Sequence, residues 1–448
     1  MMVMGIITQV KERRGNMKLR RISVDGFRNI RMSEIICSEM VALVSLNSYG
    51  KSNLLQAIDF GVDFILKNED TKKRMMSWSK GIPLNKSMPS KDFRIEFEME
   101  MSIDGSTYNV IYGYQFRWVR DDETGACIVG EWLKAKLDNK NQKYKALISR
   151  NMDKAFYRSA ESGRCSSKIS IEDNNLIVNK LKAFDSLYYY EIIKKINGLR
   201  VYIERHLDAS SSYTPDPLVR KDFNALEMEV TDNLPRVIFH LSKQYPEKYE
   251  LLKNAFMQLF PQIKEINVEE LAFKGKFHGE IPDDLPFKLS QEVYVLYVND
   301  HNLNQPVSFE DMSDGAKRVF LLLTNIIIAD INNLSLIAVE EPENSIHPSL
   351  LQSYLRVLSQ LLGKSRIIFT SHSPYIIKYL EPRNIYVGLP GKYGVAQFKR
   401  VRMSAQKTLI NDATSLEMST GDYLFELLSG TEEDIKMIEQ YLETSNNE

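Results

Sequence analysis

Two short stretches, far apart in the chain, look like the two halves of one nucleotide site, and they constrain the fold more than any other feature. The first, Ser45 to Ser52, follows a short apolar run and ends in Gly-Lys-Ser. The second, Leu334 to Glu343, is an apolar run that leads into two adjacent carboxylates. Phosphoryl transfer from a nucleotide needs little more than a phosphate cradle, a magnesium site and a positioned water. We therefore expect a fold that brings these two stretches together.

The first stretch is predicted to be a phosphate-binding loop. Met40 to Val44 suits a buried strand, and after Gly50 the apolar residues recur at helical spacing, so strand, loop and helix follow in the required order. Small residues let successive backbone N–H groups converge on phosphate oxygens, and the helix N-terminus adds positive potential. Ser45 stands where such loops usually have their first glycine, at some cost in φ freedom. The alternative is a strand-loop-helix corner with a chance Gly-Lys-Ser.

The second stretch supplies the carboxylates that the loop lacks. We expect Glu340 to lie on the magnesium side, through water, and Glu341 to orient or deprotonate the attacking water. Lys51 is expected to reach the β and γ phosphates of ATP, and the Ser52 hydroxyl to ligate Mg²⁺. An acidic exit from a strand is the alternative interpretation. The candidate ATP-binding residues of the loop are Asn47, Ser48, Gly50, Lys51 and Ser52.

Two further motifs sharpen the hypothesis. Ser313, Asp314 and Gly315 precede a long apolar helix, and a serine and a glycine at a helix start form a second anion cradle. His372 follows another buried strand, where a histidine can donate to a γ phosphate. A lone histidine at a strand end is usually structural. Its position after the carboxylate strand favours the functional interpretation here.

Together these motifs resemble the ABC-type AAA family ATPases of the RecF, SMC and OLD group. The resemblance runs from Met17 to Leu428, and Leu19 to Ile30 is similar to the first hairpin of that group. Ser45 to Ser52 matches its Walker A motif, and Leu334 to Glu341 its Walker B motif. The resemblance implies that two ATP molecules are held between two protomers. Lys51, Glu341 and His372 would act from one protomer, and Ser313 would cap the γ phosphate from the other.

Three positions depart from the pattern of the group. Ser45 replaces the first Walker A glycine, and Asp314 stands at the second signature glycine. Glu340 replaces the Walker B aspartate and is one methylene longer, which predicts water-mediated magnesium coordination and slow turnover. The long coiled-coil arms of SMC proteins and a convincing Toprim nuclease segment are missing. The chain is similar in architecture to the ATPase subunits of two-gene anti-phage defence systems such as Septu PtuA and PARIS AriA, which work with a separate effector, often a nuclease.

The expected fold class is α/β: an ABC-type P-loop ATPase head with an antiparallel β lobe and a compact helical insertion, without a long coiled coil. Strict alternation of apolar and polar residues over Phe93 to Met101 predicts the lobe. We expect residues 1–16 to be a disordered leader or an extension from an upstream start. The other predicted domains are 17–140, the first half of the head; 141–262, a mainly helical insertion; 263–404, the second half; and 405–448, a helical tail.

Composition limits the partners and the compartment. The formal net charge is −1, so bulk electrostatics do not draw the chain to nucleic acid or anionic lipid. No apolar run approaches the roughly 20 residues of a membrane-spanning helix. The three cysteines match neither a zinc pattern nor a disulfide framework, which favours a reducing cytoplasm. We therefore expect a cytoplasmic protein without membrane contact.

Three functions fit these motifs. The first is a defence ATPase that acts as sensor and scaffold, assembles at least as a dimer and controls a separately encoded effector such as a nuclease. The second is a DNA-binding repair ATPase with a role like that of RecF, which would use a basic stripe formed from Lys72 to Lys80 and Lys134 to Lys154. The third is a nucleotide-gated clamp with negligible turnover, for which Ser45 and Glu340 argue.

Overall fold

The computed structural model describes residues 17–443 except 48, 84–87, 89–90, 123, 140, 205–211, 222–223, 225, 227–232, 273–284, 345 and 364. The predicted leader, residues 1–16, and the candidate site residue Ser48 lie outside the described residues. The chain divides into two compact units. Unit 1 comprises Met1–Ile203, Leu334–Glu341 and Lys364–Glu448, and unit 2 comprises Glu204–Asn333 and Pro342–Gly363.

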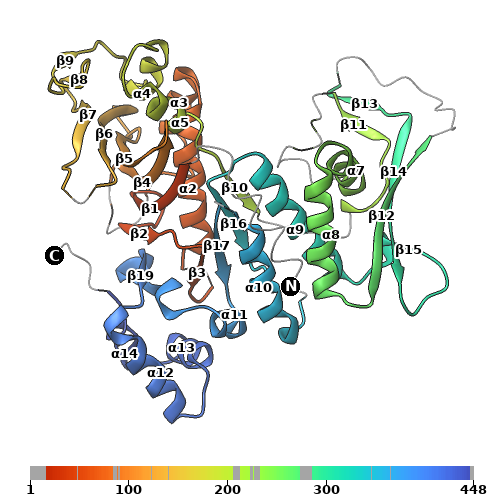
Figure 1. The fold of residues 1–448 in the computed structure, drawn as a ribbon. Coiled ribbons are helices and arrows are strands. Elements are labelled where there is room, and N and C mark those ends of the chain that lie inside the picture. Colours follow the sequence, from red (N-terminus) through yellow and green to blue (C-terminus); the bar gives the residue numbers. More distant parts are fainter. Residues whose placement is uncertain are drawn as a thin grey trace. The chain divides into compact units, whose positions relative to one another are not determined.

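A six-stranded sheet with the strand order β10-β16-β17-β3-β18-β19 carries the nucleotide motifs in unit 1 (Figure 1). The pairs β16-β17, β17-β3 and β3-β18 are parallel, and β19 returns antiparallel to β18. The central strands are apolar and buried along almost their whole length, as parallel strands covered on both faces are. Their bounds are Val201–Glu204 (β10), Leu336–Glu340 (β16), Arg366–Ser371 (β17), Met40–Val44 (β3), Ile385–Pro390 (β18) and Ala396–Arg400 (β19).

The second sheet of unit 1 has eight strands in the order β2-β1-β4-β5-β6-β7-β8-β9, and every neighbouring pair is antiparallel. The alternation predicted over Phe93 to Met101 is present in β4, and the apolar residues of this stretch are buried. The strands are Met17–Asp25 (β1), Ser33–Ile36 (β2), Phe93–Ile103 (β4), Ser106–Arg117 (β5), Cys127–Leu137 (β6), Lys145–Arg150 (β7), Ala155–Tyr157 (β8) and Ser167–Lys168 (β9).

Helix α2 (Lys51–Leu66) packs in the core of unit 1 and joins the phosphate loop to the antiparallel sheet. The Tyr114 hydroxyl donates to the Gly61 carbonyl oxygen over 2.7 Å. The Phe64 ring stacks on Tyr114 and Phe116, with centroids 5.1 and 5.0 Å apart. These contacts hold the helix, and with it the first turn at Lys51, in a fixed position against β5.

Several helices complete unit 1. Short helices follow α2 and the antiparallel sheet, and three more follow β19 and end in a capping box at Thr431. These helices are Glu69–Met76 (α3), Ile177–Lys180 (α4), Tyr190–Ile196 (α5), Pro374–Lys378 (α11), Gln406–Ser415 (α12), Thr420–Ser429 (α13) and Glu432–Glu439 (α14), with the 3₁₀ turn Leu181–Ala183 (η2) between α4 and α5.

In its described residues, unit 2 combines four α-helices with small antiparallel sheets. Phe256, Phe309 and Phe320 meet in its core, and Phe239 packs on Tyr294 with ring centroids 4.7 Å apart. The helices are Leu234–Gln244 (α7), Pro246–Leu259 (α8), Asp314–Ile331 (α9) and Pro348–Leu361 (α10), and the strands are Leu218–Arg220 (β11), Ile263–Ala272 (β12), Phe287–Leu289 (β13), Glu292–Asp300 (β14) and Val307–Ser308 (β15). Asn233 caps α7, and Pro235 lies in its first turn, where a proline is tolerated.

The predicted α/β class, with a P-loop sheet and an antiparallel lobe, is confirmed. Among the described residues the longest helix, α9, has 18 residues, so this part of the chain holds no long coiled coil. None of the described helices is long and apolar enough to cross a membrane.

The content of the predicted helical insertion, 141–262, needs correction, while the domain boundaries stay a prediction. Its first part adds β7, β8 and β9 to the antiparallel sheet, because Leu147 and Ile148 continue the buried face of β6. The helix that follows is short: α5 ends at Ile196, before Asn197 and Gly198. Val201 to Ile203 are β-branched or aromatic and form β10 instead.

Candidate nucleotide site

The order of three neighbouring parallel strands brings the predicted catalytic residues together. β17 lies between β3 and β16, with Val44 opposite Ser371 and Glu340 opposite Thr370. The carboxyl ends of all three strands therefore meet at one edge of the sheet, which is where α/β sheets bind ligands. The phosphate loop follows β3, His372 follows β17, and Glu341 follows β16.

Lys51 is buried at the start of α2 and is 7% exposed. Its Nζ donates to the carbonyl oxygens of Ser45 and Leu46 over 2.8 and 3.2 Å, and lies 3.2 Å from Nδ1 of His372. These partners are neutral oxygen and nitrogen atoms. These contacts place the Lys51 ammonium inside the loop, where an anion such as a phosphate would be bound strongly.

His372 connects Lys51 to Glu341. Its Nε2 lies 2.9 Å from Oε1 of Glu341. A neutral imidazole protonated on Nε2 satisfies both contacts, because Nδ1 then accepts from the Lys51 ammonium and Nε2–H donates to the carboxylate. Ser371 supports this placement: its hydroxyl donates to the Ser373 carbonyl over 3.3 Å and accepts from the Ser373 N–H over 3.0 Å, in the turn that carries His372.

Glu341 has a strained backbone. Its φ is +49°, in the left-handed region that side chains other than glycine rarely adopt. Its N–H donates to the Thr370 carbonyl oxygen over 2.9 Å, which extends the ladder between β16 and β17 by one residue. Strain of this kind costs of the order of 1–3 kcal/mol and is typical of functional sites. Here it turns the Glu341 side chain to His372.

Burial lowers the pKa of His372 below its ordinary value, and the positive charge of Lys51 lowers it further, while the negative charge of Glu341 raises it. We therefore expect the pKa of His372 to rise in Lys51→Ala and to fall in Glu341→Gln. Imidazole NMR titration measures both shifts, and the His372→Gln chain identifies the signal among the six histidines. Shifts in the reverse directions would contradict the contacts described here.

The loop around Lys51 fits a phosphate. Gly50 is the N-cap of α2 and no side chain caps the helix there, so its first N–H groups have no side-chain acceptor at the cap. Ser45 does not adopt a positive φ, and its buried hydroxyl lies 3.3 Å from the Lys51 Nζ. The backbone of this loop therefore does not need the φ freedom of glycine at position 45. Asn47 is exposed in the loop.

We expect Gly50→Ala to destabilise the chain by roughly 1–3 kcal/mol more than Gly105→Ala and to weaken ATP binding. Gly50 has a φ of +96°, and a Cβ there would lie 2.7 Å from the Cβ of Ala396. Gly105 has a φ of +78° with nothing within 4 Å of its Cβ position, so its substitution adds backbone strain alone. Urea unfolding compares the two chains. Equal losses would show that the approach of Ala396 is unimportant.

A hydrogen-bonded brace beside the loop was not predicted from the sequence. Asn53 in α2 donates to Asn29 Oδ1 over 2.8 Å and accepts from Arg28 Nη1 over 2.7 Å. Asn29 in turn donates to the Gly394 carbonyl over 3.0 Å. The brace therefore ties the first turn of α2 to two hairpins. Arg28 and Asn29 lie in the hairpin stretch that carries the family resemblance, but only the fold shows that they reach Asn53.

The donor set fits a magnesium ion. Ser52, in the first turn of α2, and Glu340, the last residue of β16, are both half-buried and offer hydroxyl and carboxylate oxygens, the ligand type that Mg²⁺ prefers. These residues would hold Mg²⁺, which would neutralise charge on the phosphates. Their assignment as metal ligands stays a prediction.

The predicted signature residues belong to unit 2. Ser313 is the exposed N-cap of α9, and its hydroxyl accepts from the Ala316 N–H over 3.3 Å. Asp314, also exposed, pairs with Lys317 Nζ at 3.2 Å, and Gly315 is half-buried. The helix start is thus preformed and accessible, as a second anion cradle requires. A role of Ser313, Asp314 and Gly315 in ATP binding stays a prediction.

A parallel strand, a lysine-containing loop, a helix and a neighbouring carboxylate strand define a P-loop nucleotide-binding protein. The family described as "AAA domain, putative AbiEii toxin, Type IV TA system" matches residues 42–378. This is more than half of the chain, and the chain belongs to that family.

Three solved structures of SMC heads are similar to this chain. The Smc head bound to the C-winged helix domain of ScpA has 14% identity and a TM-score of 0.49, covering 87% of this chain and 99% of that one. The Thermotoga maritima SMC head has 12% identity and a TM-score of 0.40, covering 86% and 100%. The Smc head with an extended coiled coil, bound to ScpA from Pyrococcus furiosus, has 12% identity and a TM-score of 0.46, covering 88% and 99%. No curated protein matches the chain.

Proposed function

We propose that this chain binds and hydrolyses ATP with Mg²⁺ and uses Lys51, Glu341 and His372 to do so. The observation that carries this proposal is the continuous contact from the Lys51 ammonium through the His372 ring to the Glu341 carboxylate, at the ends of three neighbouring strands. The attack of water on a γ phosphate needs a cation, a hydrogen-bond donor and a base close together, and these three residues supply them.

Each residue has a distinct task. Lys51 exchanges its bonds to the Ser45 and Leu46 carbonyl oxygens for bonds to phosphate oxygens, so the charge is already desolvated before the nucleotide arrives. Glu341 accepts the proton of the attacking water. The His372 Nε2–H holds the Glu341 carboxylate in place before the nucleotide binds, and then donates to the γ phosphate.

The complete site contains two copies of the chain. Ser313, exposed at the start of α9, caps the γ phosphate bound to the other copy, and the free N–H groups of that helix start add positive potential. The assembly is therefore at least a dimer during turnover. This step rests on the resemblance to the ABC-type ATPases and on the exposure of Ser313.

The biological role that fits best is a sensor and scaffold subunit of a bacterial anti-phage defence complex, in which the ATP state controls a separate effector such as a nuclease. The matching family description names a toxin of a toxin–antitoxin system, which supports a role in concert with another protein. Differential affinity of the effector for the ATP-bound assembly would provide the control. The role resembles that of Septu PtuA or PARIS AriA.

Purification with the product of the adjacent open reading frame tests this role. The neighbouring protein is expected to co-purify, and the complex to respond to ATP but not to DNA. ATP hydrolysis that is stimulated by DNA, with a steep dependence on salt, and no co-purifying partner would favour the repair ATPase instead. The basic stripe of the repair hypothesis would include Lys72, but this lysine is only 1% exposed and lies inside the fold. Its burial argues against DNA binding through this part of the stripe.

A further inference from the structure

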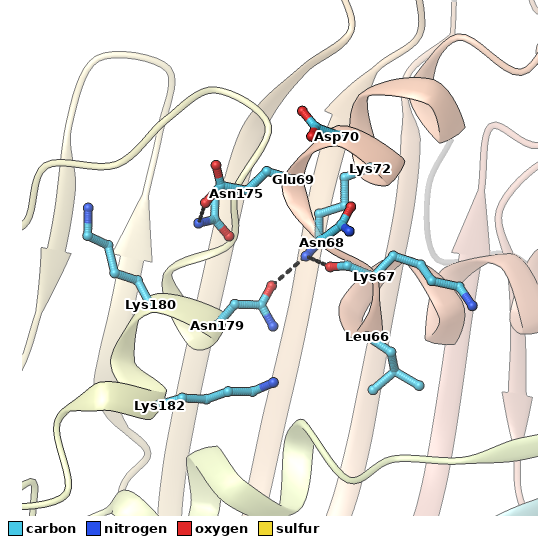
Figure 2. Close-up of a pocket in the computed structure, with 10 residues that line it drawn as sticks. All are labelled: Leu66, Lys67, Asn68, Glu69, Asp70, Lys72, Asn175, Asn179, Lys180 and Lys182. Atoms are coloured by element: carbon cyan, nitrogen blue, oxygen red, sulfur yellow. Dashed lines mark hydrogen bonds between the residues drawn. The ribbon is translucent and has the colours of Figure 1, made fainter.

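Unit 1 contains a cavity of about 510 Å³ that the nucleotide site does not use (Figure 2). It lies where α2 ends and α3 begins, with α4 and the η2 turn on its other side. Four lysines line it, against two carboxylates. A volume of this size suits a small molecule such as a nucleotide.

The Lys72 ammonium is buried at this cavity, and the residue is only 1% exposed. Its Nζ donates to the Lys67 carbonyl oxygen over 2.5 Å and to Oδ1 of Asn179 over 2.7 Å, and lies 5.9 Å from the centre of the Phe64 ring. All three partners are neutral. No ion pair joins Lys72 to a described carboxylate, so the buried ammonium directly contacts only neutral groups, while Glu131 and Glu69 act on its charge from farther away.

Lys182 is the second cation without a described carboxylate partner. Figure 2 shows its side chain extending below Asn179, the residue that binds Lys72. The other two lysines differ, because Lys67 lies 3.7 Å from Asp63 and Lys180 lies 3.9 Å from Glu172. Burial lowers the pKa of Lys72 to about 8, and the charge of Lys182 contributes to this shift, so the two ammonium groups repel each other across the cavity.

We propose that this cavity binds a small phosphorylated ligand, with a phosphate group between the ammonium groups of Lys72 and Lys182. A phosphate would give both lysines the ion-pair partner that no described carboxylate provides, and lysine binds phosphate as a compact point charge. Glu69 and Asp70 lie on the same wall and would accept hydroxyl or amino groups of the ligand. The same two carboxylates would repel a continuous nucleic-acid backbone, which favours a small ligand.

The protonation of Lys72 gives the site a pH dependence. The charged groups that act on Lys72 are Glu131 from β6, Lys182 from η2 and Glu69 from α3. The two carboxylates favour the ammonium form and Lys182 opposes it. Because the pKa is about 8, phosphate binding weakens as the pH rises through that value, when Lys72 loses its proton.

Calorimetric titration with inorganic pyrophosphate, without magnesium, tests the proposal. Lys182→Gln is expected to weaken binding at least about tenfold, the loss of one charge-assisted contact. The exposed Lys73, on α3 but outside the cavity lining, provides the matched control Lys73→Gln. Lys51→Ala removes the phosphate loop contribution and should leave the cavity component intact. Lys182 is exposed, so its substitution does not endanger the fold.

Three outcomes would overturn the proposal. Pyrophosphate binding that is lost in Lys51→Ala and unchanged in Lys182→Gln belongs to the nucleotide site alone. Equal weakening in Lys182→Gln and Lys73→Gln reflects general surface charge. Duplex DNA that binds through Lys182 while pyrophosphate does not would assign the cavity to nucleic acid. Failure of ATP hydrolysis, in contrast, would overturn the proposed function and leave this site untouched.

Discussion

Lys51→Ala is expected to weaken ATP binding and to lower hydrolysis by about 100-fold or more. The ammonium of Lys51 is desolvated and held by two carbonyl oxygens and the His372 ring, so it meets phosphate without first losing a water shell. Alanine removes the charge and leaves the Ser45 and Leu46 carbonyl oxygens facing the phosphate. Both effects disfavour the bound nucleotide.

Fluorescent ATP titration and a phosphate-release assay measure the two losses in Lys51→Ala. Lys73→Ala, at an exposed position on α3 of the same unit, is the control and should behave like the wild-type chain. Circular dichroism checks that both chains fold. Hydrolysis in Lys51→Ala within about threefold of the wild-type rate would remove Lys51 from the site.

Glu341→Gln is expected to slow hydrolysis by roughly 100- to 1,000-fold while ATP binding is preserved. The glutamine side chain can still accept the hydrogen bond from His372 Nε2, so the line from Lys51 to residue 341 stays intact. What it loses is the basicity that removes the proton of the attacking water. The rate of the chemical step therefore falls without loss of the bound state.

Single-turnover hydrolysis separates these effects. Glu417→Gln is a matched control, because Glu417 is also a glutamate in the left-handed conformation, with φ +58° against +49° for Glu341. The same substitution in the same backbone conformation should leave the rate unchanged. Indistinguishable rates in Glu341→Gln and the wild-type chain would exclude a catalytic role for Glu341 and favour the nucleotide-gated clamp.

The local parts of the site could be predicted from the sequence. Strand, loop and helix around Lys51 are encoded by contiguous signals: an apolar run, small residues and helical periodicity. Strand β16, which ends at Glu340, is likewise a contiguous apolar run. His372 was found because it follows such a run. Each of these elements takes its form from neighbours in the chain.

The long-range parts could not be predicted in the same way. The order β16-β17-β3, which places His372 between Glu341 and Lys51, is a set of pairings between distant segments. The strained φ of Glu341 has no local signature. In the sequence, Lys72 is one member of a basic run. Only the fold shows that it is buried and contacts Asn179. Strands β7 to β9 depend on a long-range pairing as well, because β7 joins the sheet along the edge of β6.

The proposed shared site takes Lys51, His372 and Glu341 from one copy of the chain and Ser313 from another. Mixing two inactive chains, Lys51→Ala and Ser313→Asp, tests it most directly. Aspartate can still cap the N-terminus of α9, as Ser313 does. Its negative charge would repel the γ phosphate. A mixed dimer then holds one intact site, built from Lys51 of one chain and Ser313 of the other.

With equal amounts and random pairing, about half of the dimers are mixed and half of their sites are intact, so we expect recovery of about a quarter of the wild-type hydrolysis rate. Two affinity tags show that mixed assemblies form. Recovery to this level would establish the shared site. Mixed assemblies without recovered hydrolysis, or a Ser313→Asp chain as active by itself as the wild type, would contradict the account.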